Sequence, residues 1–278
     1  MNGRTVVITG ATSGIGEAAA LALAAKGARI VFSARDEAKA RDLLGRLVRA
    51  NPDAAHDYVI GELSTLAGMR AAGGALAAKA PRIDVLANNA GAIFDHREVT
   101  ADGLEKTFAV DHLAYFVLTH LLAPCLDPAA ARIVSTASGA HLWGRLDFDD
   151  LQAEKKYGAM SAYGTAKLCN ILFTRELARR LKGTGVTANC LHPGFVATRF
   201  GDQSGGILSF AVRAAKNFAL TPEQGAETII YLASSPNVAD VSGGYFYKSK
   251  IATPTKEAQN DADAKRLWDV SAKLSGVG

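Results

Sequence analysis

The chain has 278 residues, a formal net charge of +4 and 49% hydrophobic residues. This length allows one or two domains, and the apolar fraction is enough for a large core. The basic residues are scattered, the densest being the pairs Lys155-Lys156 and Arg179-Arg180, which argues against binding nucleic acid or an acidic membrane surface. The three cysteines lie in apolar stretches without metal-ligand spacing, so we expect reduced core residues and no metal site.

The chain begins almost directly with a β-branched apolar run at residues 4–9, followed by a glycine-rich turn at 9–16 and an alanine-rich helical stretch to about Lys26. The glycines allow a tight turn and a close approach of backbone to a pyrophosphate, and the free N–H groups of the helix can hold the anion. Many strand-to-helix turns bind nothing, and the spacing Gly10, Gly14, Gly16 departs from the GxGxxG fingerprint. A structural turn therefore stays the alternative to a dinucleotide site.

The remaining elements alternate between apolar strands and helical periods along the whole chain. We expect further strands near residues 28–33, 57–61, 83–88, 131–136, 186–191 and 244–247, and helices near 15–26, 36–49, 65–79, 102–123, 162–182 and 222–234. The run Thr221-Pro-Glu-Gln224 has the form of a capping box with proline at the first helical position. Buried strands with helical crossovers predict an α/β, doubly wound parallel sheet of about seven strands with helices on both faces, in a single domain.

No segment has the length or flanks of a signal peptide or of a transmembrane helix. We therefore expect a cytoplasmic protein without a membrane anchor.

Tyr163 and Lys167 stand four residues apart, so on a helix they share one face. A lysine ammonium beside a phenol favours the phenolate and lowers the tyrosine pKa, as a general acid/base near neutral pH requires. An exposed tyrosine and lysine on a helix surface would have the same spacing. The surrounding motifs decide between the two interpretations.

The chain resembles the short-chain dehydrogenase/reductase family over nearly its whole length. The resemblance rests on motifs in order and at suitable spacings: Thr9-Gly10-xxx-Gly14-x-Gly16, Asn88-Asn89-Ala90-Gly91, Ser138, Tyr163-xxx-Lys167 and His192-Pro193-Gly194-Phe-Val-Ala-Thr198. More narrowly it resembles the retinol dehydrogenase-like branch, through Ser138-Gly-Ala-His141, Phe173–Lys182, His192-Pro-Gly194 and Arg266–Ser271. The resemblance implies a dinucleotide-binding part at about 1–137 and a catalytic and substrate part at about 138–278.

The resemblance implies that Tyr163 exchanges a proton with the substrate oxygen, that Ser138 hydrogen-bonds the same oxygen, and that Lys167 binds the nicotinamide ribose and keeps the Tyr163 pKa low. Ser135 competes with Ser138, but the 25-residue spacing to Tyr163 favours Ser138. Asp111 stands where this branch has an asparagine that completes the catalytic tetrad. A backbone role could survive that change, and the added carboxylate would favour the charged form of Lys167. We expect Asp111 to alter the pH profile.

Cofactor preference depends on the end of the second strand, where Arg35 and Asp36 are both present. By resemblance, the acid that selects NAD would sit at Ala34, while Arg35 is the usual partner of the NADP 2′-phosphate, with Ser33 as a second donor. We expect NADP, with NAD as the alternative. Glu62 replaces the usual aspartate of an Asp-Leu pair near the adenine. The full set of cofactor contacts implied by resemblance is Gly10, Thr12, Ser13, Gly14, Ile15, Gly16, Ser33, Arg35, Glu62, Leu63, Asn89, Ala90, Gly91, Tyr163, Lys167, Pro193, Gly194, Val196 and Thr198.

Substrate preference is expected from the segment between Thr198 and Thr221, which is rich in large apolar residues and has three early glycines. By family position it would be a mobile apolar lid, and an ordinary surface helix is the alternative. His141, Trp143, Phe195 and Phe200 are the candidate pocket residues. A lipophilic alcohol, aldehyde or ketone is the expected substrate class, with retinoids as one member.

Two other functional classes stay open. The chain could be a dinucleotide sensor or scaffold without chemistry, since a fold does not fix function. It could also be an epimerase or dehydratase acting on a nucleotide-sugar, although such relatives carry a longer C-terminal domain than the roughly 30 residues after the last strand. The helices near 102–123 and 162–182 are the family's usual dimer faces, which makes a homodimer a further expectation.

Overall fold

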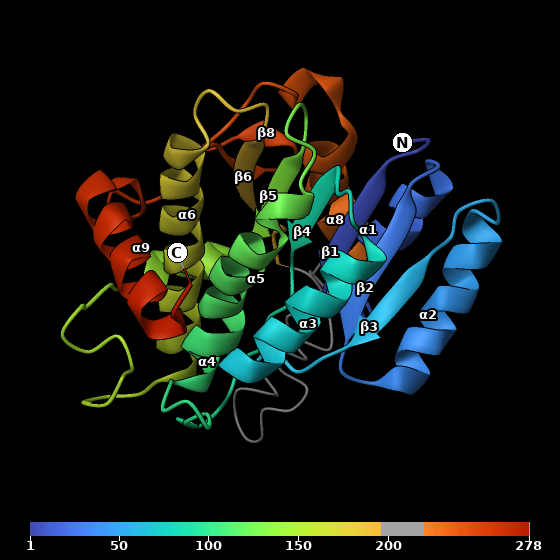
Figure 1. Cartoon of the computed structure of the whole chain (residues 1–278). Coiled ribbons are helices and arrows are strands. Elements are labelled where there is room, and N and C mark those ends of the chain that lie inside the picture. Colours follow the sequence, from blue (N-terminus) through green and yellow to red (C-terminus); the bar gives the residue numbers. More distant parts are fainter. Residues whose placement is uncertain (196–219, 278) are drawn as a thin grey trace.

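In the computed structural model, which describes residues 1–195 and 220–277, eight strands form one sheet in the order β3-β2-β1-β4-β5-β6-β7-β8 (Figure 1). Strands β1 to β7 are parallel, and β8 pairs antiparallel with β7. Their bounds are β1 Thr5–Thr9, β2 Arg29–Ala34, β3 Asp57–Ile60, β4 Val85–Asn88, β5 Arg132–Thr136, β6 Thr187–His192, β7 Tyr245–Tyr247 and β8 Lys250–Ile251. The seven expected strands and the doubly wound α/β class are confirmed, and β8 is an addition of two residues.

Helices cover both faces of the sheet because the strands bury side chains on both sides. Ile8 and Phe32 pack toward α1, α2 and α8, whereas Val7 and Val31 pack toward α3, α5 and α6. The α-helices are α1 Gly14–Ala25, α2 Glu37–Ala50, α3 Leu66–Lys79, α4 Lys106–Phe108, α5 Ala114–Leu122, α6 Ala159–Arg180, α8 Pro222–Ser234 and α9 Asp261–Ser275. The capping box predicted at Thr221 and Gln224 is present at the start of α8.

The helix expected near 102–123 begins later and is interrupted. Glu105 caps its start, accepting the N–H groups of Thr107 and Phe108, so the helix begins at Lys106. Residues Ala109–Leu113 then form a π-helical turn between α4 and α5. Such a turn widens the helix by one residue and is found frequently at functional sites.

Helix α9 packs over α5 and α6, the two helices expected to form a dimer face. Trp268 of α9 stacks on Phe173 of α6 and meets Phe116 of α5 edge-on, with ring centroids 5.8 and 5.0 Å apart. Part of the expected dimer face is therefore covered by the same chain. A homodimer stays a prediction, and any dimer through these faces has to include α9.

The α4–α5 stretch, Lys106–Cys125, is long and apolar enough to cross a membrane by length and composition alone. This differs from the expectation that no segment has the required length. Within the described residues, 67% of its apolar window is buried inside the fold, as expected of a core helix.

The sheet reverses its winding direction between β1 and β4, because β2 and β3 lie on one side of β1 and β4 to β8 on the other. Ligands of open α/β sheets bind in the crevice outside the carboxyl ends of the strands at such a switch point. The loops after Thr9 and Asn88 leave the sheet there. The Thr9 hydroxyl accepts hydrogen bonds from the N–H groups of Asn89 and Ala90 at 2.9 and 3.0 Å, which joins the two loops.

Candidate active site

The loop after β1 forms a cradle in which no side chain fits. Gly10 has a φ of +67°, and a Cβ there would lie 2.7 Å from the Cα of Ala90. A Cβ on Gly16 would collide with the carbonyl of Gly10 and the amide of Asn89. That amide in turn donates to the carbonyls of Thr9 and Gly10. Close approach of backbone to a ligand is one use of such glycines.

Helix α1 starts at this loop with its first N–H groups free of side-chain caps. Ser13 is the N-cap residue but makes no side-chain capping hydrogen bond, and Gly14 begins the helix with a φ of +59°. Thr12 and Ile15 are half-buried beside them. An uncapped helix N-terminus binds phosphate through its N–H groups and its positive dipole end. The cradle and the helix start together fit the pyrophosphate of a dinucleotide.

A cationic residue directly follows the carboxyl end of β2. Arg35 is exposed, whereas Ser33 is buried inside β2. Asp36 is the N-cap of α2 and accepts the N–H of Lys39 at 3.1 Å. A carboxylate used as a helix cap is less available for a ribose diol. Ser33, the expected second phosphate donor, is therefore not accessible to a ligand. The Arg35 guanidinium is exposed and can bind a phosphate.

Two more expected cofactor loops follow the carboxyl ends of β3 and β4. Glu62 accepts the N–H of Ser64 at 2.8 Å, and Leu63 is buried after β3. Gly91 follows β4 and lies directly against the side chains of Asp111 and Lys167, so that a Cβ on it would lie about 3 Å from both. These residues follow parallel strands and therefore lie at the same edge of the sheet as the loop after β1.

The carboxyl end of β5 and the helix α6 bring Ser138, Tyr163 and Lys167 together. Ser138 caps the 3₁₀ turn Gly139–Trp143, accepting the Ala140 N–H at 3.1 Å, and forms a hydrogen bond with Tyr163. The Lys167 Nζ lies 5.3 Å from the Tyr163 ring centroid. Ser135, the competing serine, is buried within β5. The geometry thus groups the three residues that the spacing selected.

The pKa of Tyr163 is raised above its ordinary value, not lowered as expected from Lys167. Burial of the phenol is the main cause, the Asp111 carboxylate adds to it, and the hydrogen bond with Ser138 opposes it. Lys167 makes an ion pair with Asp111, whose negative charge offsets that of the ammonium. The raised pKa therefore has two physical reasons: first the burial of the phenol, which the sequence does not reveal, and then the Asp111 carboxylate.

Asp111 lies in the π-helical turn and is fully buried. Its Oδ2 is 3.1 Å from Lys167 Nζ, and its Oδ1 accepts the Ala92 N–H at 2.8 Å. Its backbone carbonyl accepts a hydrogen bond from the Asn170 side chain at 2.8 Å. Burial raises the pKa of Asp111, while Lys167 and the Ala92 N–H oppose that rise.

Sequence reasoning missed Asn170 and the buried network behind it. Asn170 Oδ1 lies 3.3 Å from His112 Nδ1, and His112 Nε2 lies 2.9 Å from the Ser271 hydroxyl of α9. Burial lowers the pKa of His112 to about 4, so the ring is neutral at physiological pH. Asn170 stands three residues after Lys167 on the same helix face, and that spacing is the signal that could have found it.

Comparison with known proteins identifies the family. The family model for short chain dehydrogenases matches residues 4–205. The chain belongs to the short-chain dehydrogenase family. Retinol dehydrogenase 14 of Mus musculus is 41% identical to it over 100% of this chain and 87% of the relative.

Solved structures show the same fold. A protein of uncharacterized function from Mycobacterium paratuberculosis superposes with a TM-score of 0.79 at 29% identity, over 99% of this chain and 94% of that one. A short chain dehydrogenase from Burkholderia cenocepacia, in complex with NADP, superposes with a TM-score of 0.71 at 25% identity, over 88% and 96%. The chain is thus an oxidoreductase of the type that uses NAD(P).

In this dehydrogenase the His141 side chain holds two segments of the fold together and is not exposed to a substrate. The side chain is buried, with its Nδ1 2.7 Å from the Ser138 carbonyl oxygen and its Nε2 accepting the Thr255 N–H at 3.4 Å. Both ring nitrogens are thereby used, and the loop that carries Ser138 is tied to the segment after β8. The expectation that His141 lines the substrate pocket has no support in this geometry.

Large apolar side chains are exposed where the chain leaves β5 and β6. Leu142 and Trp143 are each 64% exposed, and Phe195 is 56% exposed. Pro193 and Gly194 precede Phe195, and Gly194 adopts a φ of +86° with its N–H donating to His192 Nδ1. The expected site residues Val196, Thr198 and Phe200, and the expected lid up to residue 219, lie outside the described residues.

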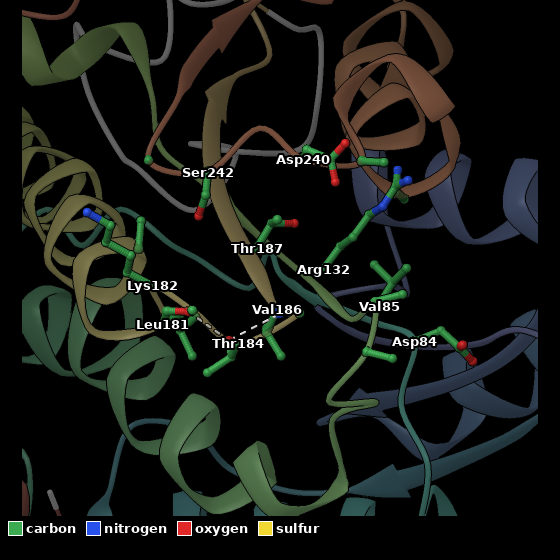
Figure 2. Close-up of a pocket in the computed structure, with 18 of the residues that line it drawn as sticks. Asp84, Val85, Arg132, Leu181, Lys182, Thr184, Val186, Thr187, Asp240 and Ser242 are labelled. Carbon is green, nitrogen blue, oxygen red and sulfur yellow. Dashed lines mark hydrogen bonds between the residues drawn. The ribbon is translucent and has the colours of Figure 1, made fainter.

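A cavity of about 780 Å³ lies at the opposite edge of the sheet (Figure 2). It is bordered by the amino ends of β5 and β6 and by the carboxyl ends of α6 and α8. Arg132 there donates to the carbonyl oxygens of Leu232 and Ser235, and Arg4 pairs with Asp84 at 2.7 Å. These cations satisfy helix ends and acids of the fold itself, so this cavity is separate from the active site.

Proposed function

We propose that this short-chain dehydrogenase is an NADP(H)-dependent enzyme that interconverts an alcohol and a carbonyl on a small apolar substrate, with Tyr163 as the general acid/base. The observation that carries the proposal is the convergence of Tyr163, Ser138 and Lys167 beside a cradle that fits a dinucleotide.

The cofactor and the protein supply different parts of the chemistry. The nicotinamide, when bound, supplies or accepts the hydride. In reduction the Tyr163 hydroxyl donates its proton to the substrate oxygen, and in oxidation the same oxygen takes the proton back. Ser138 hydrogen-bonds Tyr163 and is placed to hold the same substrate oxygen, which stabilises charge that develops there. The Nζ of Lys167 lies next to Gly91 in the loop after β4, and Lys167 would hold the ribose hydroxyls.

Two observations support NADP over NAD. Arg35 is the exposed cation at the end of β2, and its guanidinium can form two hydrogen bonds to a phosphate. The neighbouring Asp36 is engaged as the cap of α2. The Burkholderia relative with NADP bound supports the same preference.

The substrate class follows from the apolar side chains near the site and from the relative. Leu142, Trp143 and Phe195 expose apolar surface near the Ser138 turn and the end of β6. The relative of 41% identity is a retinol dehydrogenase, which makes a retinoid one candidate among lipophilic aldehydes, ketones and alcohols. A cytoplasmic location and the absence of a membrane anchor stay predictions.

The test is oxidation of NADPH against NADH with a panel of apolar aldehydes and ketones, for wild type, Tyr163→Phe and Arg35→Ser. We expect turnover with NADPH that collapses in Tyr163→Phe. In Arg35→Ser we expect the KM for NADPH to rise while the KM for NADH stays unchanged. Tight NADPH binding without turnover across the panel would instead favour a sensor or scaffold. A preference for NADH in wild type would overturn the cofactor assignment.

A further inference from the structure

The ion pair between Asp111 and Lys167 is the most deeply buried one among the ion pairs of the described residues. The exposed fractions of its side chains are 0% and 2%. An ion pair removed from water loses most of its solvation, so it adds little to stability compared with apolar residues of the same volume. A buried pair beside the acid/base of an enzyme therefore calls for a functional explanation.

The geometry holds the carboxylate against the ammonium from three sides. The π-helical turn carries Asp111, the Ala92 N–H fixes its Oδ1, and the Asn170 side chain holds its carbonyl. Gly91 leaves room for the pair, because a Cβ there would lie 3.0 Å from Asp111 Oδ2 and 3.1 Å from Lys167 Nζ. The position of the carboxylate is thus built by three separate segments of the chain: the π-helical turn, the loop after β4 and α6.

Five titratable groups face this carboxylate. Lys167 and Tyr163 lie on α6, Tyr115 on α5, His112 on the π-helical turn, and Glu105 at the start of α4. Asp111 raises the pKa of Tyr163 and of Tyr115, Glu105 raises the pKa of Asp111, and Lys167 lowers those of Asp111 and His112. Lys167 is the positive group of the set, since burial keeps His112 neutral.

The Lys167 Nζ lies 5.3 Å from the centroid of the Tyr163 ring, and an isolated ammonium at that place would stabilise the phenolate. With the carboxylate 3.1 Å from the ammonium, Tyr163 faces a dipole in place of a full positive charge. The phenol form then persists to higher pH. A phenol is the form that donates a proton to a carbonyl oxygen, whereas oxidation of an alcohol needs the phenolate.

We propose that Asp111 is a positioning residue whose carboxylate holds the Lys167 ammonium and offsets its charge, so that Tyr163 enters the reaction as a phenol and the site works as a carbonyl reductase at neutral pH and as an alcohol dehydrogenase only at alkaline pH. This inference rests on the proposed function of the same site.

The test compares Asp111→Asn with wild type in the pH dependence of kcat/KM for both directions. Removal of the negative charge lowers the Tyr163 pKa. The rising limb of alcohol oxidation and the falling limb of carbonyl reduction both move to lower pH, by about one unit as is ordinary for one nearby charge. An unchanged limb, or one that moves to higher pH, overturns the proposal.

Asp84→Asn is the matched control. Asp84 is also a buried aspartate that accepts one backbone N–H, from Thr5, and pairs with one basic side chain, Arg4, but it lies at the other edge of the sheet. We expect it to lower stability without moving either limb. A shift of the same size in both variants would mean that the loss of any buried carboxylate disturbs the enzyme, and would overturn the proposal.

A second readout does not depend on turnover. The tyrosinate absorbance of Tyr163 is obtained by subtracting the titration of each Tyr163→Phe version from that of its parent. We expect Tyr163 to titrate above free tyrosine (about 10) in wild type and at lower pH in Asp111→Asn. If wild type turns over no substrate, the proposed function fails while this titration still decides the role of Asp111. If Asp111→Asn does not fold, a wild-type Tyr163 that titrates below free tyrosine overturns the proposal.

Discussion

The two edges of the sheet each carry a buried aspartate paired with a basic side chain, but water reaches the two pairs differently. At the amino edge the Arg4 side chain is 45% exposed and Asp84 is 5% exposed. At the carboxyl edge Lys167 and Asp111 are 2% and 0% exposed. Both aspartates also accept one backbone N–H. The pairs therefore differ mainly in solvation and in their neighbours.

The difference shows at which edge of the sheet the chain has features that lower its stability. At the amino edge the charges neutralise helix ends and acids around a wide cavity, and solvent reaches the Arg4 side chain. At the carboxyl edge two charges, a π-helical turn and a side-chain-free cradle lie next to one phenol. Features of this kind persist at functional sites at the expense of stability. The following substitutions test that contrast.

The largest expected effect is on catalysis. Tyr163→Phe removes the proton donor, and we expect kcat to fall by about 10²–10⁴-fold, the usual contribution of a general acid/base. Asp84→Asn at the amino edge should leave kcat at the wild-type level. Steady-state rates and NADPH affinities of both variants test this prediction. Comparable losses of kcat in the two variants would refute the contrast between the edges.

The second effect is on stability and follows from solvation. Lys167→Met leaves Asp111 buried without its counter-charge, which costs about 3–5 kcal/mol of unfolding free energy. Arg4→Met should cost about 0–1 kcal/mol, because that arginine is half exposed. Urea denaturation measures both. The double variant Lys167→Met/Asp111→Leu should regain most of the loss, and a double variant as unstable as the single one would contradict the explanation.

The loss in Lys167→Met should also depend on pH with a definite sign. Burial raises the pKa of Asp111 in the fold above its unfolded value, and without Lys167 nothing of opposite charge offsets that rise. A group with a raised folded pKa stabilises the fold below its unfolded pKa and loses that contribution as pH rises. The variant should therefore be closest to wild type in acid and weakest at neutral pH. A loss that is constant across this range would argue against a buried charge.

The parallel strands could be predicted because each is a short apolar run bounded by turn residues, as in residues 131–136. The π-helical turn could not be predicted. An extra residue in a helix turn shifts which positions face the core, but in a helix that is apolar on nearly all sides this shift does not change the hydrophobic pattern of the sequence. The same holds for the distance between Asp111 and Lys167, which depends on how the π-helical turn and α6 pack. Tyr163 and Ser138 were found through motif spacing, whereas Asn170 was missed because its only sequence signal is its position three residues after Lys167 on the same helix face.

A third substitution tests the cradle. Gly10→Ala places a Cβ 2.7 Å from the Cα of Ala90 at a positive φ, so we expect a loss of about 1–3 kcal/mol of stability and weaker NADPH binding. Gly74, exposed in α3 with open space around it, is the control. Gly74→Ala should gain up to about 1 kcal/mol through helix propensity and leave NADPH binding unchanged. Thermal unfolding and NADPH fluorescence titration separate the two outcomes.

The smallest effect concerns two helical serines, one buried behind the catalytic edge and one beside the amino-edge cavity. The Asn170 side chain donates to the Asp111 carbonyl, so its Oδ1 accepts from His112 Nδ1, and His112 Nε2 is left to accept from Ser271. Ser271→Ala therefore leaves a buried nitrogen without a partner, at a cost of about 1 kcal/mol or somewhat more.

Ser234 is half-buried in the last turn of α8, lines the cavity and donates to the Ile230 carbonyl. Ser234→Ala should change the unfolding free energy by no more than about 0.5 kcal/mol. Because Ser271 acts on Asp111 only through His112 and Asn170, the pH limbs of Ser271→Ala should stay those of wild type. A shift of the limbs in Ser271→Ala would mean that the network controls the charge at Asp111 and not only its position, and α9 would then belong to the catalytic machinery.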